Sequence, residues 1–153
     1  MTRLRLSESQ RREIDAHLCC AYPEEGCGEL LGSEQGDTRR VERVVPFAND
    51  RPDARANRYL IAPERLLEVE REGRASGLEI LGFFHSHPDQ PADPSAFDLE
   101  HAWPYYSYLI VSVEQGRAAD ARCWRLAVDR SRFEPEAVEP GPETAHDAES
   151  RAR

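Results

Sequence analysis

The sequence predicts a single domain of the α/β class followed by a short tail. Segments with strand-like and helix-like hydrophobic spacing are mixed along the chain to about residue 138, with no internal repeat. The length of 153 residues suffices for one hydrophobic core but not for a barrel of roughly 250 residues. From residue 139 onward Pro, Gly, Glu, Asp and Ala dominate. We therefore expect a domain over residues 1–138 and a disordered acidic tail over residues 139–153.

The first half of the chain predicts a strand, a helix and a hairpin. Leu4 and Leu6 alternate as in a short strand, and Ser7 with Gln10 has the spacing of a helix capping box. Pro23 makes further helix unfavourable. The expected elements are a strand at 4–6, a helix at 7–21, and strands at 27–32 and 38–46 joined by a turn at 35–37.

The second half predicts a central strand between two helices. Residues 78–85 are almost continuously apolar, as in a strand buried on both faces. Three prolines indicate a loop over 86–94, and Asp93-Pro94 is a suitable N-cap and first-turn pair for a helix. The remaining expected elements are a strand at 59–61, a helix from 63 to 73 or 77, a helix to about 102, and strands at 105–113 and 121–128.

Composition favours an aqueous, reducing compartment. The net charge is −9, and 39% of residues are hydrophobic. No apolar run approaches the ~18 residues that span a bilayer, and the N-terminus lacks a signal peptide pattern. We therefore expect a cytoplasmic protein with reduced cysteines and no membrane partner. All 20 basic residues are scattered arginines, which argues against a nucleic-acid partner. The sequence leaves the oligomeric state open.

Four polar side chains have the spacing of a metal site. His85 and His87, two residues apart at the end of a strand, project to the same side. Ser95 and Asp98, three residues apart, share a face of the predicted short helix. Two imidazoles and one carboxylate leave the fourth position of a tetrahedral zinc open, as in catalytic rather than structural sites. A nearby carboxylate would act as general base, and spacing alone makes Glu24 and Glu25 equal candidates.

Structural interpretations compete at several of these positions. Ser95 is also a favourable helix N-cap residue, and His101 is either a partner of Asp98 or simply exposed, which we favour. Cys27 is expected to be a buried apolar residue rather than a ligand. Other zinc classes fit poorly: Gln90 breaks the metallo-β-lactamase motif, amidohydrolase barrels are longer, and the P-C-x-x-C signature of deaminases is missing.

The sequence E25 … H85-S-H87-P … S95-A-F-D98 resembles the motif of the JAMM, or MPN-plus, metallopeptidases. The segment Y22-P-E-E-G-C-G28 is similar to the one that precedes the first core strand in that family, and the element order agrees over about residues 4–138. The resemblance implies a curved mixed β-sheet flanked by helices, of the cytidine-deaminase-like type. It also implies one catalytic zinc on His85, His87 and Asp98, with Glu25 as general base and Ser95 as the oxyanion donor.

The resemblance further implies a substrate class. Members of the family remove ubiquitin-like modifiers by cutting after a C-terminal Gly-Gly, and short bacterial members act on sulfur carriers of the ThiS and MoaD kind. We therefore expect a zinc peptidase or isopeptidase whose partner is a ubiquitin-like or sulfur-carrier protein. The alternative is a non-catalytic MPN-type scaffold, in which one or more ligands are usually absent.

Overall fold

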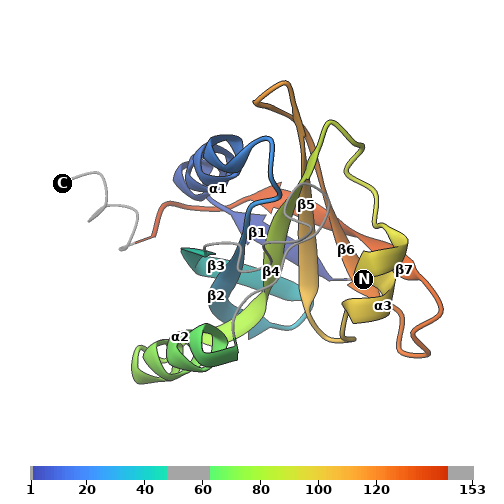
Figure 1. Cartoon of the computed structure of the whole chain (residues 1–153). Coiled ribbons are helices and arrows are strands. Elements are labelled where there is room, and N and C mark those ends of the chain that lie inside the picture. Colours follow the sequence, from blue (N-terminus) through green and yellow to red (C-terminus); the bar gives the residue numbers. More distant parts are fainter. Residues whose placement is uncertain (1, 48–62, 145–153) are drawn as a thin grey trace.

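The computed structural model describes residues 2–47 and 63–144, which form a β-barrel with three helices on its outside (Figure 1). The predicted strand at 59–61 lies outside the described residues. In chain order the elements are β1 (Arg3–Leu6), α1 (Glu8–Ala21), β2 (Cys27–Gln35), β3 (Thr38–Phe47), α2 (Pro63–Ala75), β4 (Glu79–Pro88), α3 (Ala96–His101), β5 (Ser107–Glu114), β6 (Arg117–Leu126) and β7 (Phe133–Pro140).

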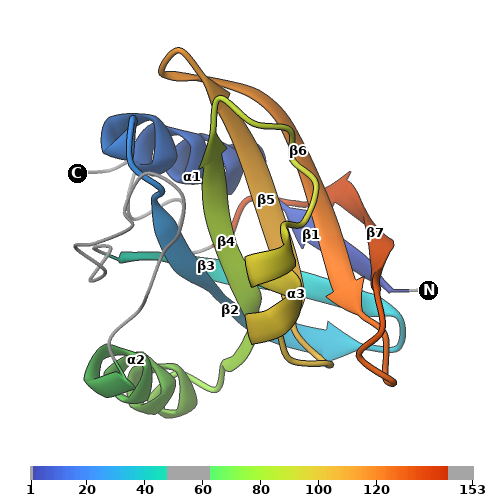
Figure 2. The same cartoon turned by 45° about the vertical axis from the view of Figure 1, so that its right-hand side comes forward.

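The sheet is mixed, as predicted, but it closes on itself. The strand order is β1-β3-β2-β4-β5-β6-β7, and β1 lies parallel to β3 on one side and to β7 on the other. The expectation of a curved sheet is therefore corrected to a barrel. The four-residue strand β1 makes the difference, because it joins two strands that would otherwise be edges (Figure 2).

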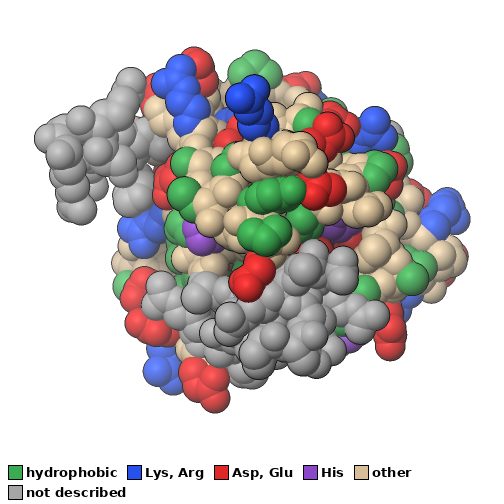
Figure 3. Space-filling model, turned by 45° about the horizontal axis from the view of Figure 1, so that its top comes forward, with side chains coloured by type: hydrophobic (Ala, Val, Ile, Leu, Met, Phe, Trp, Pro, Cys, Tyr) green, Lys and Arg blue, Asp and Glu red, His purple; other side chains and the backbone are tan. Residues whose placement is uncertain are grey.

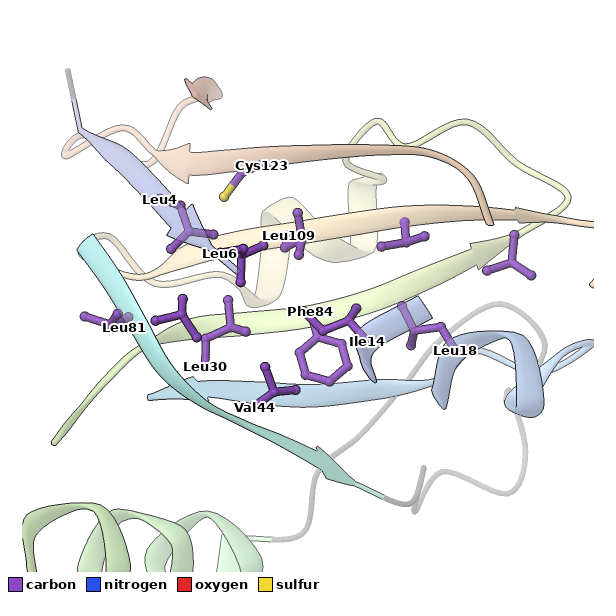
Figure 4. Close-up of a cluster of buried hydrophobic side chains, with 13 residues drawn as sticks. Leu4, Leu6, Ile14, Leu18, Leu30, Val44, Leu81, Phe84, Leu109 and Cys123 are labelled. Carbon is purple, nitrogen blue, oxygen red and sulfur yellow. The ribbon is translucent and has the colours of Figure 1, made fainter. Parts of the chain in front are cut away.

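Helix α1 begins where the sequence predicts and packs across one end of the barrel, with its apolar side chains in the core. The Ser7 hydroxyl accepts from the Gln10 amide at 3.1 Å, and the Gln10 side chain accepts from the Ser7 amide at 2.9 Å, which completes the capping box. Ile14 and Leu18, four residues apart, are fully buried. Figure 4 shows Ile14 beside Phe84 of β4, with Leu18 further along in the same apolar cluster.

A second apolar cluster lies between the barrel and α2. It consists of the buried residues Cys27, Leu31, Phe47 and Val69, with partly buried neighbours from β3 and β4. Strand β4 therefore has apolar neighbours on both faces, as its continuous apolar sequence predicts. It pairs along its length with β2 and β5 and continues to Pro88, three residues into the predicted loop.

The last strand, β7, is absent from the prediction. It pairs antiparallel with β6 and parallel with β1, and its sequence, FEPEAVEP, contains two prolines and three glutamates. Contacts with the barrel continue past the predicted domain end at residue 138. The Gly141 amide donates to the Leu6 carbonyl at 2.8 Å, and Thr144 is 6% exposed. Residues 145–153 of the predicted tail lie outside the described part of the chain.

Candidate metal centre

The structure brings His85, His87 and Asp98 together. The histidines lie on one face of β4 because side chains alternate along a strand, and Asp98 reaches them from α3. His85 Nε2 lies 3.2 Å from Asp98 Oδ1, and His87 Nε2 lies 3.1 Å from Asp98 Oδ2. The two Nε2 atoms are 3.2 Å apart. One ligand atom from each of the three residues therefore lies within 4.8 Å of the other two, although the residues come from two distant segments.

These distances suit a tetrahedral zinc ion. With bonds of about 2.0–2.1 Å to nitrogen and oxygen, neighbouring ligand atoms in a tetrahedron are roughly 3.3–3.4 Å apart. The separations of 3.1–3.2 Å are close to that value, with each histidine nearest to a different oxygen of Asp98. Two imidazoles and one carboxylate also match the donor types of catalytic zinc sites. The residues present therefore fit zinc.

A backbone contact fixes the ring of His87. Its Nδ1 lies 2.9 Å from the Pro91 carbonyl oxygen. Because a carbonyl can only accept, Nδ1 carries the proton, and the neutral ring presents the lone pair of Nε2 to the cluster. This is the arrangement expected of a metal-ligating histidine.

The loop that carries Pro91 is itself tied to the barrel. The Ser112 hydroxyl donates to the Gln90 carbonyl at 2.6 Å, and the Trp124 indole donates to the Ala92 carbonyl at 3.0 Å. Asp93 pairs with Arg122 of β6 at 3.0 Å. Asp93 is therefore not the N-cap that the sequence suggested, because its carboxylate faces β6.

Ser95 is the N-cap of α3, and Asp98 completes its capping box. The Ser95 hydroxyl accepts from the Asp98 amide at 3.1 Å, and the Ser95 amide donates to Asp98 Oδ2 at 2.8 Å. The carboxylate is thus oriented by the start of the helix and still faces both histidines.

Asp98 and His87 shift each other's pKa in opposite directions. Burial opposes ionisation of Asp98, but the adjacent His85 and His87 and the Ser95 amide outweigh it and hold the pKa of Asp98 well below its usual range. Burial likewise opposes protonation of His87, but Asp98, the Pro91 carbonyl and Glu25 raise its pKa above 6.5. The cluster therefore attracts positive charge, whether a proton or a metal ion.

The structure separates the two candidate bases. Glu25 is 4% exposed and lines a pocket of about 360 Å³ together with His87 and Ser95, whereas Glu24 is exposed. The segment before Glu25 is held near the loop after His87, because the Tyr22 hydroxyl donates to Asp89 at 2.6 Å. On the face shown in Figure 3, histidine is visible only as small patches among hydrophobic and acidic side chains.

The remaining sequence candidates lie outside the cluster. Cys27 is fully buried among apolar residues, as predicted, and no disulfide joins the four cysteines, all of which lie in the described part of the chain. His101 is exposed, also as predicted, and its ring stacks on Phe97 with centroids 4.0 Å apart. Sequence reasoning missed the contact between Tyr22 and Asp89 and the two hydrogen bonds between Ser86 and Gly26. Only the position of Ser86 between the two histidines could have indicated its importance.

Residues 7–127 match the protein family described as prokaryotic homologs of the JAB domain. The chain belongs to this family. The match covers the barrel from α1 to the end of β6 and includes His85, His87 and Asp98, the candidate metal-ligand cluster. The predicted family resemblance is therefore confirmed. Among the described residues, no helix has the length and apolar character needed to cross a bilayer.

Named relatives and solved structures agree with this assignment. The chain is 37% identical to a probable TtuB-protein conjugate cleaving protease of Thermus thermophilus over 69% of this chain and 68% of that protein. It is 38% identical to a desampylase of Haloferax volcanii, over 72% and 81% of the two chains. The solution structure of a Desulfitobacterium hafniense protein covers 95% of this chain and 97% of its own, with a TM-score of 0.80 and 34% identity. A Salinibacter ruber protein covers 94% of each chain, with a TM-score of 0.70 and 38% identity.

Proposed function

We propose that this prokaryotic JAB protein is a zinc-dependent peptidase that hydrolyses the amide bond after the C-terminal Gly-Gly of a ubiquitin-like or sulfur-carrier protein. The observation that carries the proposal is the convergence of His85, His87 and Asp98 beside a pocket lined by Glu25 and Ser95. The substrate class is supported by the relatives named as a TtuB-conjugate cleaving protease and as desampylases. We expect the same chemistry to act on a carrier of the ThiS or MoaD kind.

Each residue has a role that its surroundings permit. His85, His87 and Asp98 would hold one zinc ion, which would act as a Lewis acid on the scissile carbonyl and the attacking water. Glu25 takes a proton from that water and passes it to the leaving amine. Its placement in the pocket wall next to His87 suits this role.

Ser95 can serve as helix cap and oxyanion donor at once. Its oxygen accepts from the Asp98 amide, which leaves the hydroxyl hydrogen available to donate. Ser95 is exposed and lines the pocket, so a substrate oxygen can reach it. In this role the hydroxyl donates to the negative charge that develops on the carbonyl oxygen.

The non-catalytic scaffold remains the alternative function. A scaffold does not need the ligands or the base, yet the complete set is present at ligand-ligand distances of 3.1–3.2 Å. The same fold could still bind a carrier without cleaving it. Product formation therefore decides between the two functions.

The test is incubation with a ThiS-like carrier extended by a short peptide beyond its Gly-Gly, followed by intact mass spectrometry. We expect release of a product that ends at Gly-Gly, blocked by a chelator, and about one zinc per chain. An unchanged mass with several carriers would favour the scaffold.

Glu25→Gln tests the general base, and Glu24→Gln is its matched control. We expect the Glu25 variant to keep its zinc and to lose about 10²–10⁴-fold in rate, because only the proton acceptor is removed. The exposed Glu24 variant should retain wild-type activity. Full activity in the Glu25 variant, or absence of zinc from the wild type, would refute the mechanism.

A further inference from the structure

Ser86 lies between the two histidines but faces the opposite side of β4. Because side chains alternate along a strand, the His85 and His87 rings point to the metal-ligand cluster while the Ser86 hydroxyl points towards the interior. Ser86 is 0% exposed. Its side chain therefore cannot touch a substrate, and any effect on the reaction must act through its neighbours.

The backbone amide and the side-chain hydroxyl of Ser86 both form hydrogen bonds with Gly26, the residue before β2. The Ser86 amide donates to the Gly26 carbonyl at 3.0 Å, and the Gly26 amide donates to the Ser86 hydroxyl at 2.9 Å. In a regular antiparallel pair the second bond would go to the Ser86 carbonyl. Here the hydroxyl replaces that carbonyl, at the point where the segment carrying Glu25 joins β2.

Helix α1 holds Gly26 from the other side. A Cβ atom at this position would lie 2.9 Å from Leu18 Cδ2 and 3.0 Å from Ala21 Cβ, so that any side chain here would require α1 side chains to shift. The Gly26 backbone is therefore confined between α1 and the Ser86 hydroxyl. Glu25 is the adjacent residue, so the position of its carboxylate depends on where this backbone lies.

We propose that Ser86 is a positioning residue for Glu25: its buried hydroxyl fixes the Gly26 backbone and thereby places the Glu25 carboxylate beside the metal-ligand cluster. This inference rests on the proposed function. It assigns Ser86 to the geometry of the base and not to metal binding, because the strand that carries both histidines is also held by its pairing with β2 and β5. His87 is in addition fixed by the Pro91 carbonyl.

The test compares Ser86→Ala with Ser86→Thr, using the extended ThiS-like carrier and measuring kcat, KM and zinc content. We expect Ser86→Ala to keep one zinc and a KM within about twofold of wild type, while kcat falls at least about tenfold, because a small displacement of the base slows proton transfer. Ser86→Thr retains the hydroxyl and should stay within about threefold of the wild-type kcat.

Ser107→Ala is a matched control for lost stability. It also removes a fully buried strand hydroxyl, which donates to Glu136 at 2.6 Å on β7. We expect this variant to lower Tm while kcat stays within about twofold of wild type. A fall in kcat of the same size as in Ser86→Ala would show that instability alone explains the loss, and would overturn the proposal.

Two further results separate this inference from the proposed function. If the wild type releases no product, the proposed function is wrong, whereas an active wild type with an unchanged kcat in Ser86→Ala overturns only the role of Ser86. Crystal structures of the wild type and of Ser86→Ala test the role of Ser86 without a measurement of activity. We expect the variant to show a displaced Glu25 carboxylate, and superimposable Glu25 positions would refute the proposal.

Discussion

Substitution of Ser95 can separate its role as helix cap from its role as hydrogen-bond donor. Alanine removes both the capping oxygen and the hydroxyl hydrogen. Glycine also removes both, but it is itself a tolerated N-cap residue and costs only a few tenths of a kcal/mol. Threonine keeps both. The three variants therefore vary helix stability and donor capacity independently.

The structure sets the size of each effect. Helix α3 has six residues, none of them fully buried, and besides its caps only the partly buried Leu99 packs against an apolar cluster of the barrel. The caps therefore contribute a large share of its stability. We expect Ser95→Ala to lower stability by about 1 kcal/mol, or ~2–4 °C in Tm. Loss of an oxyanion donor costs about 10²–10³-fold in kcat. Zinc content should not change, because the backbone amide of residue 95 still donates to Asp98 in every variant.

The assay is a thermal melt of each zinc-loaded variant together with kcat on the extended carrier. Alanine and glycine should lose the same factor in kcat although only alanine lowers Tm appreciably, and threonine should stay near wild type. A glycine variant with a kcat within about threefold of wild type would refute the donor role. Rates that follow Tm across the three variants would refute it as well.

Two other properties follow from the structure. Without metal, protonated His87 stabilises the fold fully below its ordinary pKa of 6.5, and this contribution is lost as pH rises through its raised pKa. Ionised Asp98 stabilises the fold fully above its ordinary pKa of 3.8, and this contribution is lost as pH falls through its lowered pKa. Chelator-treated protein should therefore melt at its highest temperature between about pH 4 and 6.5, and a Tm that rises from pH 6.5 to 8 would contradict this. Gly82→Ala should cost about 3 kcal/mol, or ~6–12 °C in Tm, because its Cβ would lie 1.9 Å from the Ser107 carbonyl oxygen. In the control Gly73→Ala nothing lies closer than 3.4 Å, and an equal loss of Tm there would refute the steric explanation.

Helix starts and tight turns were predicted correctly where they depend on residues close together in the sequence. The capping box of Ser7 and Gln10 places the start of α1 correctly, because both of its hydrogen bonds join residues three apart. The Gln115-Gly116 pair in the sequence predicts the turn that joins β5 and β6, where Gly116 takes a φ of +80°. Such features depend on neighbouring residues and are therefore visible in the sequence.

The barrel closure was missed because its residues look unsuitable for a core. Glu136 of β7 is 5% exposed, with its carboxylate bound by Ser107 and Thr2 and near Arg125. Arg39 of β3 is fully buried and donates to Ser107 and to the Leu81 carbonyl. A prediction from hydrophobic periodicity places such charged residues on the surface. Here they are buried because residues distant in the sequence supply their hydrogen bonds and opposite charges.

A similar failure affects the predicted alternation on β3. The alternation of Val41, Arg43 and Val45 in the sequence predicts that these residues share a face. Val41, however, packs in the barrel core and Val45 in the cluster beneath α2. Leu31 of β2 pairs with Arg43 while the next residue, Gly32, pairs with Val41, so β3 holds one extra residue at this bulge. A bulge reverses the facing of every later residue, and the sequence of one strand does not reveal it.

The convergence of His85, His87 and Asp98 was predictable because one spacing serves two purposes. A capping box requires a side chain three residues after the N-cap to point back towards the start of the helix. In α3 that side chain is Asp98, and the same orientation brings its oxygens to 3.1–3.2 Å from the two histidines. The spacing S-x-x-D therefore indicates a helix start and a ligand at once, which is why sequence alone could not choose between a structural and a catalytic Ser95. The glycine and alanine variants make that choice by experiment.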